Sequence, residues 1–183
     1  LFVSDLHLDA ASPKANDAFM RFLGRQARAA SALYVLGDLF ETWIGDDDPD
    51  PVRDTVCRGL AACVAAGTAV FVMHGNRDFL YGPAFERRTG CHVLPDPAVV
   101  TLFGRRILLC HGDLLCTADH AYQELRSTVR SDGFRDRALA LPLEARQLLA
   151  GAARAGSKAH TATQRAEIMD VAPDAVLAAF RAT

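Results

Sequence analysis

The sequence predicts an α/β protein in which helices cover a mostly parallel β-sheet. Short apolar runs that fit buried strands alternate with segments whose apolar residues recur at helical spacing. Four blocks of acidic, imidazole or amide side chains each follow such an apolar run directly. From about residue 119 onward, helical patterns alone continue. We therefore expect one domain over residues 1–183, with a helical lid inserted at about 119–165.

Strand and helix patterns alternate along the first part of the chain. Strands are expected over residues 1–3, 33–36 and 69–73, and a two-stranded hairpin over 99–103 and 106–110. The first helix places Phe19 and Leu23 on one side. The second begins with Asp50 as N-cap and Pro51 at the first helical position, and Gly67 ends it. Three later helices are expected over 122–129, 139–153 and 173–182.

The composition argues against nucleic acid as the main partner. With 20 basic and 22 acidic residues, the chain has a net charge of −2. It therefore lacks the broad cationic field that holds the phosphates of nucleic acid. Its 183 residues are 50% hydrophobic, which is enough to bury a full core in one domain.

Cysteine usage and hydropathy predict a cytoplasmic protein. The five cysteines are odd in number, lack C-x-x-C spacing and lie mostly in apolar segments, which favours reduced thiols. No apolar run approaches the roughly 18–20 residues that a membrane-spanning helix needs, and no leader precedes Leu1. Because Leu1 is not Met and the first strand begins at once, we expect the native chain to begin upstream.

The four polar blocks predict a shared metal site. Asp5 and His7 are two residues apart, so on a strand both side chains would point to the same face and reach one ion. Asp38 follows a buried-strand pattern, where an ionised carboxylate is costly unless it is paired or bound to a metal. Asn76 and His111 follow later apolar runs. Each block alone fits a turn or a helix cap, but four at the carboxyl ends of successive strands favour one site.

The residue types indicate two-metal hydrolysis of a phosphoester. Oxygen ligands mixed with imidazole, without thiolate, suit Mn²⁺ better than a structural zinc ion. A bridging Asp38 can hold two cations about 3.5–4 Å apart, which activate water as the nucleophile and clamp the phosphoryl oxygens. Arg77 supplies a planar guanidinium for charge that develops on phosphate, and Gly75 lets the backbone approach a ligand closely.

Two further acids are expected to orient histidines. Asp78 and Asp113 lie in the third and fourth blocks, and carboxylates commonly accept a hydrogen bond from a metal-bound imidazole. We therefore expect Asp78 and Asp113 to bond with His74 or His111. No Ser-His-Asp or Cys-His pairing offers a convincing alternative nucleophile.

Together the blocks resemble the calcineurin-like metallophosphoesterase family over residues 1–113. They read SDLHL at 4–8, GDLFE at 37–41, GNRD at 75–78 and HGD at 111–113. The resemblance implies a sandwich of mixed β-sheets flanked by helices, with two Mn²⁺ ions in the complete site. It also implies five metal ligands: Asp5, His7, Asp38, Asn76 and His111.

Longer strings resemble the branch of that family that acts in lipid A biosynthesis. They lie at residues 36–48, 74–80, 111–117, 139–142 and 168–171. The resemblance implies a cytoplasmic enzyme, peripheral on the inner membrane of a Gram-negative bacterium, that hydrolyses the pyrophosphate of a UDP-diacylglucosamine lipid with Mn²⁺. We also expect a monomer. A helical lid suits such a substrate, because burying acyl methylenes contributes about 0.8 kcal/mol each.

The same resemblance implies catalytic and substrate-binding positions. Catalytic roles fall on Asp38, Asn76 and Arg77. Substrate contacts fall on Asn76, Arg77, Asp119, Ser157, Thr161 and Gln164. Thr161 and Gln164 replace the amide and the lysine that are familiar at these two positions, and Gln164 matches the pattern least well.

One part of the family pattern is absent. In that family a Gly-His-x-His segment after a further strand completes the second metal site, and no such segment occurs before Thr183. His120 and His160 are not spaced to replace it. We therefore expect a fragment whose C-terminal strands are missing, rather than a degenerate homologue.

Two other functions remain open at this point. A different hydrolase of the same family would act on nucleotides or phosphoproteins, although nucleotides would not require the helical insertion around residues 139–142. A non-catalytic module would keep the phosphoesterase fold as a binding platform. Metal titration separates the second alternative, because a pure scaffold need not bind two Mn²⁺ ions.

Overall fold

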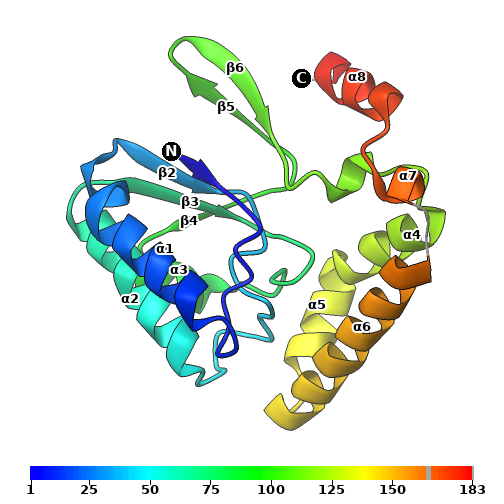
Figure 1. The fold of residues 1–183 in the computed structure, drawn as a ribbon, viewed down its shortest axis with the longest axis horizontal. Helices are drawn as coiled ribbons and strands as arrows, with labels where there is room; N and C mark the ends of the chain where they lie inside the picture. Colours follow the sequence, from blue (N-terminus) through cyan, green and yellow to red (C-terminus); the bar gives the residue numbers. More distant parts are fainter. Residues whose placement is uncertain (164–165, 183) are drawn as a thin grey trace. The chain divides into compact units, whose positions relative to one another are not determined.

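The computed structural model describes residues 1–163 and 166–182, and the side chains of all of these except 160–163 and 166–167. Two compact units divide the chain, Leu1–Ala98 and Val99–Thr183. The first unit contains a sheet with helices, and the second contains a hairpin followed by helices (Figure 1). The predicted α/β class is therefore confirmed. The single domain over residues 1–183 depends on how the units combine and stays a prediction.

The first unit is built on a four-stranded parallel sheet. Its strands pair in the order β1 (Phe2–Val3), β2 (Ala32–Val35), β3 (Ala69–Met73) and β4 (His92–Leu94). The three strands predicted here are confirmed to within one residue at each end. The sequence did not predict β4, because three residues are too few to show a strand pattern.

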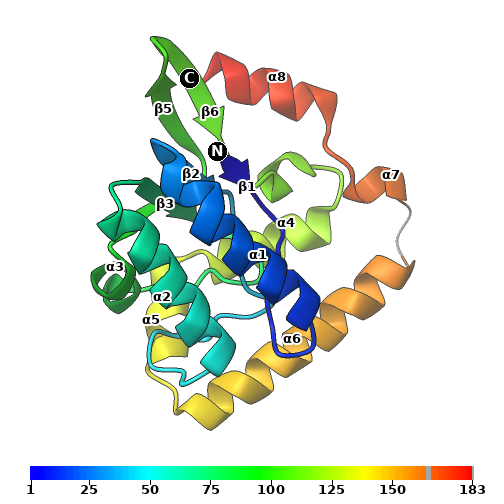
Figure 2. The same cartoon turned by 60° about the vertical axis from the view of Figure 1, so that its left-hand side comes forward.

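Helices connect these parallel strands, as crossover connections require. They are α1 (Pro13–Arg25) with the short 3₁₀ turn η1 (Ala27–Ala29), α2 (Pro51–Ala65) and α3 (Pro83–Thr89). Helices α1 and α2 lie side by side on one face of the sheet in both views (Figures 1 and 2). Phe19 and Leu23 of α1 are buried, as their helical spacing predicted.

Both ends of α2 agree with the predicted signals. The Asp50 side chain accepts hydrogen bonds from the Val52 and Arg53 N–H groups at 2.8 and 3.0 Å, so Asp50 is the N-cap. Gly67 follows the helix with a φ of 98°, a conformation that glycine adopts without strain. The start and the end of this helix are therefore encoded locally.

An aromatic row crosses the sheet from β1 to β4. Neighbouring rings stack or tilt against each other, with centroids 5.0, 4.8 and 5.7 Å apart, in the order Phe2, Tyr34, Phe71 and His92. These four residues are also paired in register across the strands. Val70, which points to the opposite face, is 1% exposed. Alternation along the strands thus separates a helix-covered aliphatic face from an aromatic face.

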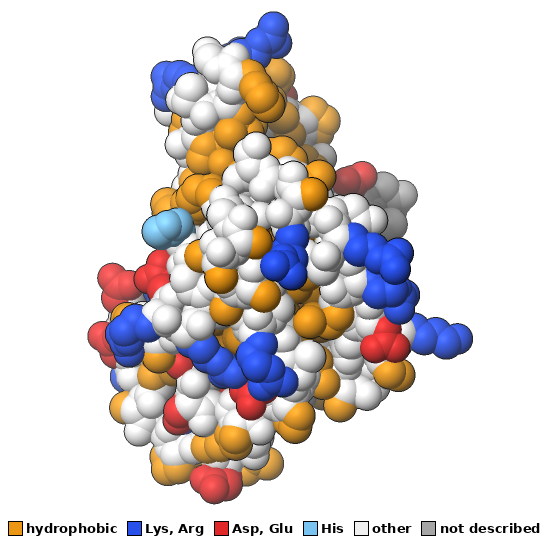
Figure 3. Space-filling model, turned by 90° about the vertical axis from the view of Figure 1, so that its left-hand side faces the viewer, with side chains coloured by type: hydrophobic (Ala, Val, Ile, Leu, Met, Phe, Trp, Pro, Cys, Tyr) orange, Lys and Arg blue, Asp and Glu red, His pale blue; other side chains and the backbone are white. Residues whose placement is uncertain are grey.

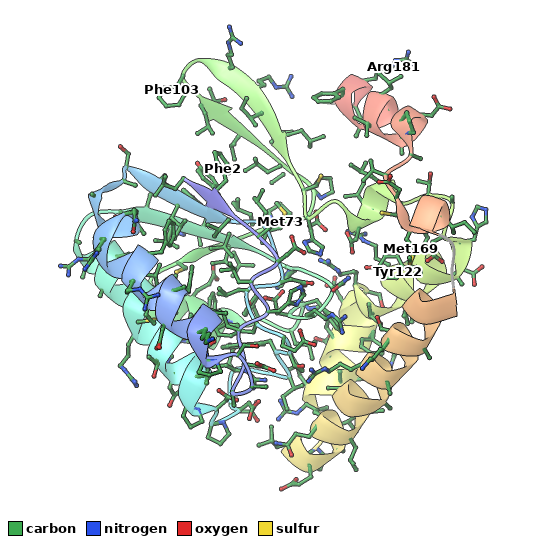
Figure 4. The ribbon with its side chains drawn as sticks, viewed as in Figure 1. Phe2, Met73, Phe103, Tyr122, Met169 and Arg181 are labelled. Carbon is green, nitrogen blue, oxygen red and sulfur yellow. The ribbon has the colours of Figure 1, made fainter. Side chains whose placement is uncertain are left out.

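The second unit opens with the predicted hairpin. Its strands are β5 (Ala98–Leu102) and β6 (Arg105–Leu109). Phe103 and Gly104 form the turn with φ angles of 52° and 76°, as a two-residue hairpin loop requires. Phe103 is fully exposed at the tip, where Figure 4 labels it.

Helices occupy the rest of the second unit. They are the 3₁₀ turn η2 (Asp113–Leu115), α4 (His120–Val129), α5 (Asp132–Leu139), α6 (Leu143–Thr163), α7 (Ala166–Met169) and α8 (Pro173–Arg181). The helix predicted over 139–153 is wrong at its start, because α5 ends at Leu139 and α6 begins at Leu143. Pro142 disfavours helical backbone at the residue before it, which explains the break. The lid function of these helices stays a prediction.

Surface and hydropathy add two observations. On the face drawn in Figure 3, Lys and Arg side chains lie among acidic and uncharged ones, in keeping with the balanced composition. Among the described residues, no helix combines the length and the apolar character that crossing a bilayer demands.

Candidate metal and phosphate site

Three of the predicted metal ligands have an unusual backbone conformation. Asp5, His7 and Asp38 have φ angles of 53°, 48° and 53°, in the left-handed region that residues other than glycine rarely occupy. Strand β1 ends at Val3, so the expectation that Asp5 and His7 lie on a strand is wrong. Such residues cost about 1–3 kcal/mol each and persist where the surrounding structure holds them, often at functional sites.

Backbone hydrogen bonds hold the Asp5–His7 segment against the Asp38 segment. The Asp5 N–H donates to the Gly37 carbonyl at 3.2 Å. The His7 N–H donates to the Asp38 carbonyl at 3.0 Å. The two segments thus continue the β1–β2 pairing beyond the strand ends, and they place Asp5 and His7 beside Asp38.

Asp38 is the buried member of this group. It is 2% exposed, and one of its carboxylate oxygens lies within 4.8 Å of a carboxylate oxygen of Asp5. Its Oδ1 accepts a hydrogen bond from the Arg77 N–H at 2.8 Å, and its Oδ2 lies 3.7 Å from His7 Nε2. Neighbouring carboxylates repel each other unless a proton or a cation compensates them. Two carboxylates beside an imidazole therefore fit a divalent cation.

Gly75 makes room for Asp38. Strand β3 ends at Met73, labelled in Figure 4, and Gly75 follows two residues later. A Cβ atom on Gly75 would overlap both the side chain and the backbone nitrogen of Asp38. Only glycine fits this position, as expected for a close backbone approach at the site.

Asp78 ties the segments of the site together. It is completely buried. It accepts hydrogen bonds from the N–H groups of Asp38, Phe40 and Gly75 and from the Tyr81 hydroxyl. These four donors fill the acceptor positions of one carboxylate, so the expectation that Asp78 orients a histidine is wrong.

The pKa values of Asp78 and Tyr81 reflect this burial. Burial raises the pKa of Asp78, although its hydrogen bonds oppose the shift. Burial and the adjacent Asp78 raise the pKa of Tyr81 well above its ordinary value, so the hydroxyl keeps its proton and donates. Asp78 and Tyr81 therefore hold the backbone segments of the site in place.

Arg77 lies next to an acid that sequence reasoning missed. Its Nη1 is 3.9 Å from Glu41 Oε1, and Glu41 Oε2 is 3.1 Å from His7 Nδ1. The available signal was a carboxylate three residues after Asp38, in an otherwise apolar segment. Asn76 is exposed, and its role as a metal ligand stays a prediction.

In the second unit, His111 lies just after β6, as predicted, and Asp113 begins the 3₁₀ turn η2 that leads toward α4. Asp113 accepts a hydrogen bond from the Tyr122 hydroxyl at 2.7 Å and lies 3.0 Å from Arg126 Nε. Burial alone would raise its pKa, but Tyr122, Arg126, His111 and Arg130 together lower it below the ordinary value. His111 is thus close enough to influence the Asp113 carboxylate, but the closest partners of Asp113 are side chains of α4. The expectation that Asp113 orients His111 stays a prediction.

Two of the predicted substrate contacts of the second unit, Asp119 and Ser157, have described side chains and lie on different helices. Asp119 is 7% exposed and caps α4, because its carboxylate accepts from the Tyr122 N–H at 3.0 Å. Ser157 is exposed on α6. The Thr161 side chain and Gln164 lie outside the described residues. Substrate binding at all four positions stays a prediction.

Curated relatives decide the family. The chain is 47% identical to a protein of Stenotrophomonas maltophilia strain K279a over 98% of this chain and 75% of the relative. Relatives from Pseudomonas paraeruginosa and Escherichia coli O7:K1 are 48% and 46% identical, over 99% and 98% of this chain and 75% of each relative. All three are named UDP-2,3-diacylglucosamine hydrolase. The chain belongs to the UDP-2,3-diacylglucosamine hydrolase family.

Membership in the UDP-2,3-diacylglucosamine hydrolase family places the chain among hydrolytic enzymes and confirms the narrower sequence resemblance. No protein-family model matches the chain. Among solved structures, a protein of unknown function from Aquifex aeolicus is 18% identical, with a TM-score of 0.40 over 74% of this chain and 72% of that chain. That likeness is too weak to support a structural argument.

Proposed function

We propose that this chain hydrolyses the pyrophosphate bond of UDP-2,3-diacylglucosamine to 2,3-diacylglucosamine 1-phosphate and UMP, in lipid A biosynthesis. The observation that carries the proposal is the buried Asp38 carboxylate beside Asp5 and His7, in a chain from a family of hydrolases with that substrate in its name. Water attacks phosphorus, and the anhydride oxygen leaves with the other phosphoryl group.

The cofactor that we propose is a pair of Mn²⁺ ions. The ligands would be Asp5, His7, Asp38, Asn76 and His111. The donor set fits, because it combines oxygen and imidazole ligands without thiolate. When bound, the two ions supply Lewis-acid stabilisation and activation of the attacking water. Among these ligands we assign the central role to Asp38, since it is the most buried carboxylate of the group.

Arg77 would bind the diphosphate of the substrate. Its guanidinium side chain is 27% exposed, so it remains accessible, and its backbone N–H is already engaged by Asp38. A guanidinium can donate two parallel hydrogen bonds to phosphoryl oxygens and keeps its charge at any physiological pH. Asn76, Asp119, Ser157, Thr161 and Gln164 would contribute further substrate contacts.

The acyl chains would lie along the helices of the second unit, at the cytoplasmic face of the inner membrane. Leu148 and Leu149 of α6 are 76% and 55% exposed, which favours contact with lipid over packing inside the protein. We propose a peripheral, monomeric enzyme, because such exposed leucines permit membrane contact without a spanning segment.

Turnover by the purified full-length gene product tests the function. UDP-2,3-diacylglucosamine is compared with UDP-glucose and a soluble phosphodiester, each with Mn²⁺ and with EDTA. We expect UMP release from the diacyl substrate but not from UDP-glucose, slower hydrolysis of the soluble phosphodiester, and loss of both activities with EDTA. In labelled water, one ¹⁸O atom should enter a phosphoryl product. Equal turnover of UDP-glucose would indicate another phosphodiesterase, and metal binding without turnover would indicate a scaffold.

A further inference from the structure

Glu41 lies on the central one of three neighbouring backbone segments. Its N–H donates to the Leu8 carbonyl at 3.2 Å, which joins it to the segment that carries His7. Two residues later, the Trp43 N–H donates to the Arg77 carbonyl at 3.2 Å. These bonds place the segment of Glu41 between His7 on one side and Arg77 on the other.

The carboxylate of Glu41 reaches both neighbours, one with each oxygen. Oε2 lies 3.1 Å from His7 Nδ1, and Oε1 lies 3.9 Å from Arg77 Nη1. The Glu41 side chain is 20% exposed, against 36% for His7 and 27% for Arg77. Glu41 is thus the most enclosed of the three, as a group that holds the other two should be.

The His7 ring is turned so that its two nitrogens face different partners. Nδ1 faces Glu41, and Nε2 lies 3.7 Å from Asp38 Oδ2. When Nδ1 carries the proton, Nε2 is left with a lone pair directed toward the buried carboxylate. In this structure the 3.1 Å contact between Nδ1 and Oε2 is a close polar contact without the angle of a hydrogen bond. A rotation of the His7 ring would make it one, and a hydrogen bond to one ring nitrogen selects the tautomer that frees the other for a metal ion.

We propose that Glu41 is a positioning residue that serves two functional groups at once: it holds His7 with Nε2 free for a cation, and it orients the guanidinium of Arg77. The inference deepens the proposed function and rests on it, since it assumes that His7 binds metal and Arg77 binds phosphate. Glu41 itself contacts neither the metal ion nor the phosphate.

The two partners require a carboxylate rather than an amide. His7 Nδ1 can donate to one oxygen of Glu41, and the Arg77 guanidinium is a cation 3.9 Å from the other, so one partner needs an acceptor and the other needs negative charge. In Glu41→Gln the amide oxygen can still accept from His7, but the neutral NH₂ group then faces Arg77 and no longer attracts it. In Glu41→Ala both contacts are lost. The two variants therefore separate the two roles.

Metal titration and kinetics of the full-length gene product provide the first test. For Glu41→Ala, we expect Mn²⁺ affinity to fall by about ten- to a hundredfold, the range found when a residue that orients a metal ligand is removed. For Glu41→Gln, we expect Mn²⁺ affinity near that of the unmodified protein but a lower kcat/KM. Asp17→Ala, which removes an exposed acid of α1, is the matched control and should change neither.

A second readout does not depend on metal or activity. In ¹⁵N-detected NMR of the metal-free protein above pH 8, we expect His7 to carry its proton on Nδ1, and Glu41→Ala to shift the proton toward Nε2. A protein that fails to hydrolyse the diacyl substrate but shows this change in tautomer refutes the proposed function and leaves the role of Glu41 intact. An unchanged tautomer and unchanged Mn²⁺ affinity in Glu41→Ala overturn the inference, as does equal loss of Mn²⁺ affinity in the Ala and Gln variants.

Discussion

The two units of the chain hold their predicted functional residues in different ways. In the first unit, the candidate ligands follow strands of the parallel sheet, and α2 alone buries five of its residues. In the second unit, helices α4, α5 and α8, whose side chains are all described, bury none of theirs. The proposed metal site would therefore lie on preorganised backbone, as an ion that tolerates little displacement requires, whereas the proposed contacts of a large flexible ligand would lie on exposed helical surface.

The two units also differ in the kind of groups that their carboxylates hold. Asp78 alone joins three backbone N–H groups across the loops that follow β2 and β3. In the second unit, Asp113 instead contacts side chains of α4: it accepts a hydrogen bond from the Tyr122 hydroxyl and forms an ion pair with Arg126. Backbone anchoring restricts geometry more than side-chain anchoring does, because long side chains retain rotamer freedom. Substitutions in the first unit should therefore have the larger effects.

Replacement of Asp38, for which we propose the bridging role, should have the largest effect. Asp38→Asn keeps an oxygen that can accept from the Arg77 N–H, so the fold should survive, but the bridging charge is lost. We expect metal-dependent turnover to fall by more than about a hundredfold, with weaker Mn²⁺ binding. Turnover, metal titration and a thermal melt measure this. Asp136→Asn on α5 is the control, and full Mn²⁺-dependent turnover of Asp38→Asn would show that Asp38 does not bridge.

The next largest effect separates two adjacent residues. Arg77→Ala should lower kcat/KM by roughly a hundredfold while Mn²⁺ affinity stays near normal, because the proposed role of the guanidinium is to bind phosphate rather than metal. Asn76→Ala should instead weaken Mn²⁺ binding. Kinetics and metal titration on both variants decide it. If Arg77→Ala turns over normally, Arg77 is only a surface partner of Glu41, and pairs of that kind contribute little.

A pair of glycine substitutions compares the two units through stability. Gly75→Ala should lower the free energy of unfolding by about 1–3 kcal/mol, because the new methyl group collides with Asp38. Gly151→Ala, in the interior of α6 with open space around it, should raise the same quantity by about 0.5–1 kcal/mol. Urea unfolding measures both. A Gly75→Ala protein as stable as the unmodified one would mean that the loop after β3 adapts easily.

The smallest expected effect concerns lipid contact. Replacing Leu148 and Leu149 by Asp should weaken liposome association or raise KM for the diacyl substrate several-fold, while a soluble phosphodiester is hydrolysed as before. Gln147→Asp adds charge on α6 without removing apolar surface and serves as the control. Equal losses with both substrates would indicate that the leucines pack inside the protein.

Local sequence determined much of the fold of this chain. The strands β1 to β3, the Asp50 cap of α2, the hairpin turn at Gly104 and the start of α8 all follow from patterns within a few residues. The types of ligand could also be predicted, because a carboxylate or imidazole directly after a buried strand is energetically costly unless it is paired or bound to a metal. Breaks between helices were harder to predict: the break between Leu139 and Leu143 was missed.

How the site residues are held depends on contacts between segments far apart in the sequence. The left-handed conformations of Asp5, His7 and Asp38 depend on hydrogen bonds between segments more than thirty residues apart, and no local pattern records such partners. The same reason hid the roles of two acids: Asp78 was expected to orient a histidine but anchors backbone, and Glu41 was not singled out although it lies between His7 and Arg77. Sequence specifies which groups are available for chemistry, whereas their partners are set by packing between distant segments, where burial makes an unpaired polar group costly.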